Sequence, residues 1–259
     1  MFLIKLLLPI CAFIFGSLIG SFLNVCIVRI PKGESIVRPP SHCPSCNKAI
    51  AWYDNIPILS YLVLMGKCRS CGGRISVVYP LVELATALVS LILFIKFGPS
   101  LEYLYIFILW SLLAIVTVID LRFRIIPDVI TLPGIVVGLG FSLLLQRLSF
   151  VDSIIGAVAG GGVLFLVGIS YYAIRKKEGM GGGDVKLLAM IGAFLGWRSL
   201  LMILFVSSVF GSVVGIGFIL FARKDRSFPI PFGPFLAFGA LAYVIWGQQF
   251  TEMFLFPVR

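Results

Sequence analysis

The sequence predicts an all-α protein, a polytopic bundle of about eight transmembrane helices that carries one small extramembrane loop. Three observations support this fold class. Of the 259 residues, 60% are hydrophobic and only 12% are charged, and the mean hydropathy is +1.10. Because a soluble domain is usually about 45–50% apolar and about 25% charged, this composition excludes an ordinary soluble domain.

The expected membrane spans follow from segment length, because a bilayer core of roughly 30 Å takes about 20 apolar residues per helix. The first segment is longer than the apolar core of a signal peptide, and no small-residue cleavage site follows it, so we expect a retained anchor. The sixth segment is short and suits a partly re-entrant helix. The expected spans are 5–28, 77–96, 101–119, 129–147, 154–174, 186–197, 199–221 and 232–248.

The basic residues predict the orientation of the bundle. The chain has 21 Lys and Arg residues and a net charge of +10. If the N-terminus lies outside, 16 of these 21 residues fall on the cytoplasmic side and five fall outside, as the positive-inside rule requires. No basic run is paired with an aromatic platform, so the charge indicates topology and not nucleic-acid binding. The expected domains are 1–28, the first transmembrane helix, 29–76, a cytoplasmic loop, and 77–259, the remaining bundle.

The cytoplasmic loop contains two CxxC pairs, Cys43/Cys46 and Cys68/Cys71, with 21 residues between them. Two such turns can direct four sulfur atoms at one structural zinc ion, as in a zinc ribbon. A reducing cell interior disfavours disulfides, and a domain of under about 50 residues needs a staple. Reduced cysteines without a metal, or two redox pairs, remain the alternative. His42 could be a neighbour of the site or an alternative ligand.

Two aspartates stand at the expected inner edge of the membrane. Asp120 ends the third span, and Asp184 begins the sixth after Gly181, Gly182 and Gly183. A charge at bilayer depth costs ~3 kcal/mol or more, which favours a functional role. Two carboxylates held close together share a proton, and the pair can then activate water against a peptide bond. The glycines would let the backbone come close to an extended peptide and adopt positive φ.

Other interpretations of these acids stay open. Asp128 follows Pro127 and precedes an apolar run, which is typical of a helix N-cap. Asp184 could also be an N-cap, with the glycines serving as a linker. A phosphate-binding loop is disfavoured because GxxxxGK[ST] is absent here. A transporter or scaffold that uses intramembrane acids for protons remains possible.

Six segments, taken together and in order, resemble the bifunctional prepilin peptidases (type IV leader peptidase/N-methyltransferase), which belong to the GxGD intramembrane aspartyl proteases. The resemblance covers nearly the whole chain. The segments are GSLIGSFLNVCIVRIP (16–31), CPSCNKAIAWYDNIPILSYLVLMGKCRSC (43–71), ISVVYPLVEL (75–84), IDLRFRIIPD (119–128), GMGGGDVKL (179–187) and PFGPFLAFG (231–239).

The resemblance implies an activity that the residues alone do not specify. Asp120 and Asp184 match the two catalytic aspartates, and Asp128 matches a less essential position. The implied substrates are type IV prepilins and pseudopilins, bound through their apolar N-terminal helix and cleaved on the cytoplasmic side of the inner membrane. The new N-terminal residue is then methylated with S-adenosylmethionine. The particular substrates, their role in pili, secretion or DNA uptake, and the oligomeric state are not implied.

The methyltransferase half rests on the resemblance alone, since no glycine-rich nucleotide fingerprint follows a strand. Its candidate residues are Asn24, Gly66, Lys67 and Glu83. Each has a structural alternative: Gly66 and Lys67 as a turn beside the metal, Asn24 as a helix-packing residue, and Glu83 as the buried partner of a loop arginine. A peptidase without methyl transfer is the nearest rival function.

Overall fold

The structure is a computed structural model that describes residues 2–145, 148–177, 181–221 and 231–254. Gly179 and Met180 of the glycine motif, and the charged turn 223–226, lie outside these residues. Within them the chain is helical. The elements are α1 (Phe2–Arg29), η1 (Ile30–Lys32), η2 (Trp52–Asn55), α2 (Leu59–Val63), α3 (Val78–Phe97), α4 (Leu101–Phe123), α5 (Asp128–Ser142), α6 (Phe150–Arg175), α7 (Gly182–Leu195), α8 (Trp197–Phe221) and α9 (Gly233–Phe254).

The eight long helices coincide with the eight predicted spans, and the short α2 in the loop is the only α-helix that the sequence did not predict among the described residues. Within the described residues, five helices are long and apolar enough to cross a membrane: α1, α3, α4, α6 and α8. The 14 residues of α7 extend only about 21 Å, so this helix falls short of the roughly 30 Å hydrocarbon core. The sequence had indicated such a short sixth segment.

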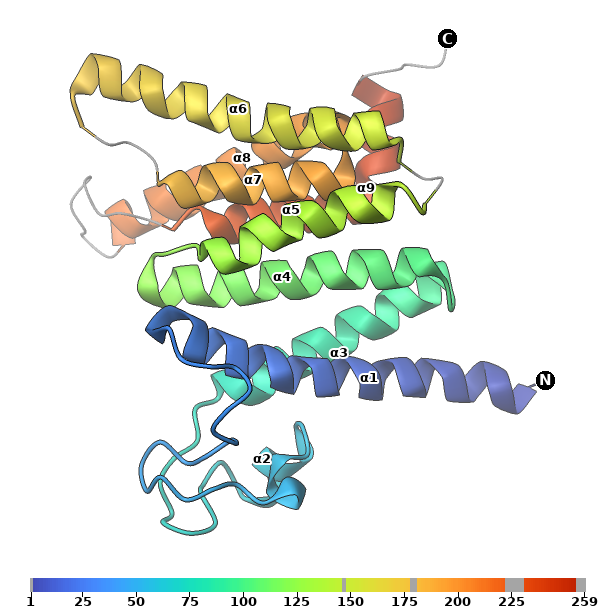
Figure 1. The fold of residues 1–259 in the computed structure, drawn as a ribbon, viewed down its shortest axis with the longest axis vertical. Coiled ribbons are helices and arrows are strands. Elements are labelled where there is room, and N and C mark those ends of the chain that lie inside the picture. Colours follow the sequence, from blue (N-terminus) through green and yellow to red (C-terminus); the bar gives the residue numbers. More distant parts are fainter. Residues whose placement is uncertain (1, 146–147, 178–180, 222–230, 255–259) are drawn as a thin grey trace. The chain divides into compact units, whose positions relative to one another are not determined.

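The chain divides into two compact units, Met1–Ile115 and Val116–Arg259, with α4 contributing to both. In the first unit α1 packs along α3. A Cβ added at Gly20 would lie 2.7 Å from the Glu83 Cα, so the two backbones touch where a larger residue would hold them apart. The buried Ser90 hydroxyl also donates to the Ala12 carbonyl oxygen at 2.6 Å. This unit carries the cysteine loop between α1 and α3 (Figure 1).

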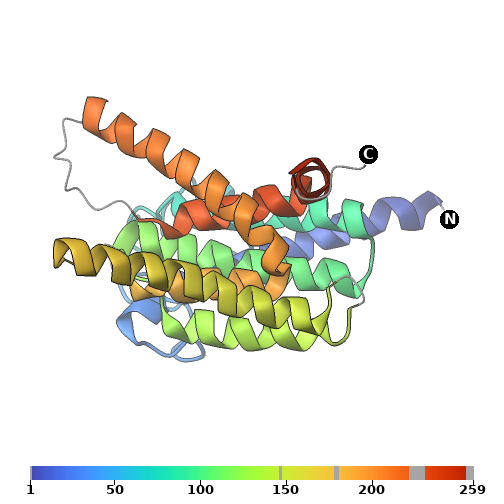
Figure 2. The ribbon, with the colours of Figure 1, turned by 90° about the horizontal axis from the view of Figure 1, so that it is seen from above.

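In the second unit α7 is the central helix, packed against α5, α6, α8 and α9. Figures 1 and 2 both show it lying along α6. Glycines bring α6 and α5 close to α7. A Cβ at Gly156 of α6 would overlap the Gly192 carbonyl oxygen, and one at Gly138 of α5 would lie 2.8 Å from the Phe194 ring. Because its neighbours cover it, most of α7 is buried despite its length. The start of α7, which carries Asp184, extends from this buried part of the helix and is less buried itself.

Candidate active site

Asp120 lies in the last turn of α4, and its residue is only 5% exposed. Its Oδ2 accepts a hydrogen bond of 3.0 Å from the backbone N–H of Gly233, the first residue of α9. The first N–H groups of a helix have no partner inside the helix, and they carry its positive dipole end. The Asp120 carboxylate therefore completes the start of α9, and this contact fixes its orientation.

Asp184 lies in the first turn of α7 and is half-buried. Its Oδ1 is buried and has no hydrogen-bond partner among the described residues. Its carboxylate is near enough to Asp120 for the two to interact electrostatically. Two acids from segments far apart in the sequence thus lie near one another within the second unit. A buried polar atom without a protein partner needs another one, such as water or a substrate.

Ile126 joins the elements that carry the two acids. A Cβ added at Gly183 would lie 2.7 Å from the Ile126 Cβ, and a Cβ at Gly233 would lie 3.3 Å from its Cδ1 and 2.7 Å from Asp120 Oδ2. The turn between α4 and α5 therefore packs against the starts of α7 and α9. Sequence reasoning missed Ile126 and Gly233, although Gly233 lies in the PFGPFLAFG segment quoted for the resemblance.

Two expectations about local geometry were wrong. Neither Asp128 nor Asp184 is an N-cap: Pro127 and Gly181 occupy those positions, without side-chain capping bonds. Asp128 instead forms an ion pair with Lys186, with 2.6 Å between Oδ2 and Nζ. This ion pair connects the starts of α5 and α7.

The glycines also differ from their expected geometry. Gly181 has a φ of −72°, and Gly182 and Gly183 already belong to α7, so positive φ is not the reason for glycine here. Close approach is the reason at Gly183, where Ile126 leaves no room for a Cβ. A GGG stretch at this position begins a helix and does not act as a flexible loop.

The four loop cysteines form one cluster. Their Sγ atoms all lie within 4.8 Å of one another, and those of Cys43 and Cys71 are 3.9 Å apart. A tetrahedral zinc site with Zn–S bonds of about 2.3 Å separates its sulfurs by about 3.8 Å, so the cluster has the dimensions of a metal site. Backbone N–H groups of Ser45 and Cys46 lower the pKa of the Cys43 thiol to about 6, which favours the thiolate that a metal binds.

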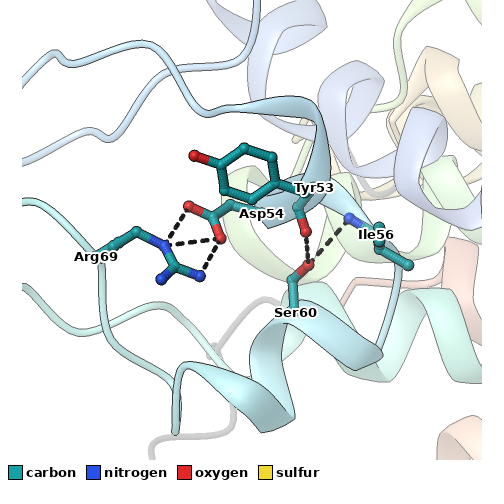
Figure 3. Close-up of polar contacts among 5 residues, drawn as sticks. All are labelled: Tyr53, Asp54, Ile56, Ser60 and Arg69. Carbon is teal, nitrogen blue, oxygen red and sulfur yellow. Dashed lines mark hydrogen bonds and ion pairs between the residues drawn. The ribbon is translucent and has the colours of Figure 1, made fainter.

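His42 is not among the residues whose ligand atoms gather in this cluster, and its Nδ1 lies 3.2 Å from the Pro40 carbonyl oxygen. A second contact braces the cysteine turns. Arg69, between Cys68 and Cys71, donates from Nε and Nη2 to the Asp54 carboxylate at distances of 2.7–3.0 Å (Figure 3). The guanidinium lowers the pKa of the Asp54 carboxyl.

The four methyltransferase candidates lie in the first unit. Asn24 and Glu83 are buried where α1 packs along α3: Asn24 Nδ2 donates to the Tyr79 carbonyl oxygen at 3.0 Å, and Glu83 Oε2 accepts from the Ile58 N–H at 2.7 Å. The partners of Glu83 that the structure shows are thus a backbone N–H and the Ser21 side chain, where an arginine was expected. Gly66 is buried with a φ of 69°, and Lys67 is exposed. Their role in methyl transfer stays a prediction.

Comparisons with known proteins identify the family of the chain. The family model of the bacterial peptidase A24 N-terminal domain matches residues 14–97, and that of the type IV leader peptidase family matches residues 106–216. No solved structure matches the chain.

Relatives cover the chain more fully. A prepilin leader peptidase/N-methyltransferase of Aeromonas hydrophila is 41% identical over 267 residues, covering 94% of this chain and 92% of that protein. Proteins with the same name from Pseudomonas aeruginosa and Myxococcus xanthus are 37% and 43% identical, over 95% and 81% of this chain and 93% and 63% of their own. With its five apolar helices, this is a multi-pass membrane protein. The chain belongs to the type IV leader peptidase family.

Proposed function

We propose that this protein removes the leader from type IV prepilins and pseudopilins and then methylates the new N-terminal residue. The observation that carries the peptidase half is the meeting of two carboxylates, Asp120 and Asp184, with Asp184 Oδ1 buried and without a partner among the described residues. The names of the relatives support both halves of the proposal.

The peptidase reaction needs a base and an acid on either side of one water molecule. One carboxylate takes a proton from the water, and the oxygen of that water attacks the carbonyl carbon of the leader's last peptide bond. The other, carrying the shared proton, donates it to that carbonyl oxygen, and a proton then passes to the leaving amine. The N–H of Gly233 holds one oxygen of Asp120, which leaves the other oxygen for the proton transfer that we propose. Gly181–Gly183 would line the cleft.

The methyl transfer uses the amine that hydrolysis releases. When bound, S-adenosylmethionine would supply the methyl group to the amine nitrogen once that nitrogen has lost a proton, with the remaining thioether as the co-product. We assign this activity to the loop 29–76 and its flanking helices, with Asn24, Gly66, Lys67 and Glu83 as candidate residues. Residues 77–259 form the peptidase bundle.

The four cysteines would hold a structural zinc ion, because four sulfur ligands leave no open coordination position for catalysis. We propose that the N-terminus lies outside and the catalytic side in the cytoplasm, at the inner membrane, and the distribution of the basic residues supports this orientation. The prepilin would present its apolar helix from within the bilayer, next to the bundle.

The test uses purified protein in liposomes with a prepilin substrate. Mass spectrometry should show a product shortened by its leader, and addition of S-adenosylmethionine should increase the product mass by one methyl group. Cleavage without methylation would support the rival function of a peptidase that does not transfer methyl groups. An intact prepilin, with the protein folded and its metal bound, would favour the rival of a transporter or scaffold.

A further inference from the structure

The cysteine loop exposes a cluster of large apolar side chains around α2. Trp52 and Met65 are each 81% exposed, and Val63 is 74% exposed. We call this surface the α2 patch, and it consists of Trp52, Leu59, Leu62, Val63 and Met65. Trp52 lies in η2, which packs against α2, so these exposed side chains come from neighbouring segments. Exposed apolar side chains gathered in this way mark an interaction site, since a loop surrounded by water gains nothing from them.

The α2 patch lies beside the membrane-spanning helices, not beyond their ends. The N–H of Ile58, just before α2, donates to Glu83 Oε2 at 2.7 Å. Glu83 is five residues after Val78, the start of α3, and therefore about 7 Å along the helix axis. Figure 1 shows α2 alongside α1 and α3.

The depth of Glu83 in the bilayer can be estimated from the length of α3. Its 20 residues extend about 30 Å, which is the whole thickness of the hydrocarbon core. A residue about 7 Å inside that length lies at the level of the upper acyl chains, and α2 is bonded to it there. Val77, just before α3, and Leu81, in its first turn, are further exposed apolar side chains at this end of α3.

The segment is braced in a way that presents these side chains outward. The Ser60 hydroxyl accepts from the Ile56 N–H and donates to the Tyr53 carbonyl oxygen, both at 3.0 Å (Figure 3). The ion pair of Asp54 with Arg69 provides a polar flank next to Trp52 and Tyr53. Aromatic residues beside polar groups are typical of the membrane–water interface.

We propose that the α2 patch is a membrane anchor, with its side chains inserted among the phospholipid acyl chains of the leaflet where α1 ends and α3 begins. The occupant of the patch is therefore lipid. Insertion holds the four-cysteine cluster at the membrane surface through the bracing of Arg69 and Asp54. This inference does not depend on the proposed peptidase or methyltransferase activity.

Fluorescence of Trp52 tests the proposal in the full-length protein. The protein is reconstituted in phosphatidylcholine–phosphatidylglycerol liposomes with bromine atoms near the glycerol end of the acyl chains. The emission of Trp52 is obtained as wild type minus Trp52→Phe, a mild change at so exposed a position. We expect brominated lipid to quench most of this emission and aqueous iodide to quench little. Strong iodide quenching with no bromine quenching would overturn the proposal, as would protection from both, which would indicate a protein partner.

A matched pair of variants checks that the patch itself causes insertion. Val63→Glu places a charge in the patch, whereas Val37→Glu places one at a loop residue outside it that is 77% exposed. Each variant is compared with and without Trp52→Phe, and its bound metal is measured to show that the loop has folded. We expect Val63→Glu to lose most of the bromine quenching of Trp52 and Val37→Glu to retain it. Equal effects of the two charges, or none from Val63→Glu, would contradict insertion by the α2 patch.

Discussion

Replacing Gly233 by alanine should separate the start of α9 from Asp120. The added Cβ would lie 2.7 Å from Asp120 Oδ2, whereas ordinary contacts begin at 3.4 Å, so the carboxylate or the helix must move by about 0.7 Å. A comparable shift would take the 3.0 Å bond from the Gly233 N–H out of hydrogen-bond range. Because a misplacement of 1 Å in a catalytic group can cost about 100-fold in rate, we expect kcat for leader cleavage to fall about 100-fold.

The assay is steady-state cleavage of a prepilin in liposomes, with kcat and KM determined separately. The loss should fall on kcat, since the substitution does not change the surface that faces lipid. Gly211→Ala is the control, because its Cβ would lie 3.6 Å from the Phe235 ring, an ordinary contact with the same α9 segment. Wild-type kcat in Gly233→Ala, or an equal loss in both variants, would refute the reasoning.

Three further predictions concern the ion pair, the helix packing and the metal. Lys186→Asp and Asp128→Lys should each reduce the cleavage rate by less than about tenfold, because an exposed ion pair contributes at most about 1 kcal/mol. The double variant, which exchanges the two charges, should recover the cleavage rate, and no recovery would argue against the ion pair. Gly192→Ala should destabilise the bundle by about 1–3 kcal/mol in unfolding titrations, because its Cβ overlaps the Gly156 carbonyl oxygen, and unchanged stability would contradict the packing. Cys71→Ser should reduce the amount of bound metal and lower the unfolding midpoint temperature of the loop. A variant that binds as much metal as the wild type would contradict a metal site formed by the four cysteines.

Much of this fold could be predicted because bilayer thickness restricts the length of each apolar segment. The eight expected spans correspond to eight helices, and even the short α7 was anticipated. The short α2 was missed because five residues give no periodic signal, and its position depends on a tertiary bond to Glu83. The cysteine cluster was predictable because each CxxC turn directs two sulfur atoms to the same side, so that two such turns can bind one metal ion.

The candidate site was predictable in its residue types but not in its contacts. Asp120 and Asp184 stood out as charges at membrane edges. Neither the support of Asp120 by Gly233 nor the insertion of Ile126 follows from sequence spacing, because both depend on how separate helices pack. The capping interpretation of Asp128 was wrong for the same reason: its ion pair with Lys186 comes from another helix.

The central claim is that Asp120 and Asp184 act as one catalytic pair. The most direct measurement is the leader-cleavage rate of Asp120→Asn, Asp184→Asn and the double variant, each with its bound metal determined to verify folding. We expect each single substitution to reduce cleavage to background and the double variant to be no worse than either, because residues that act as a unit are not additive. Substantial cleavage by either single variant, or losses that multiply in the double variant, would contradict the account.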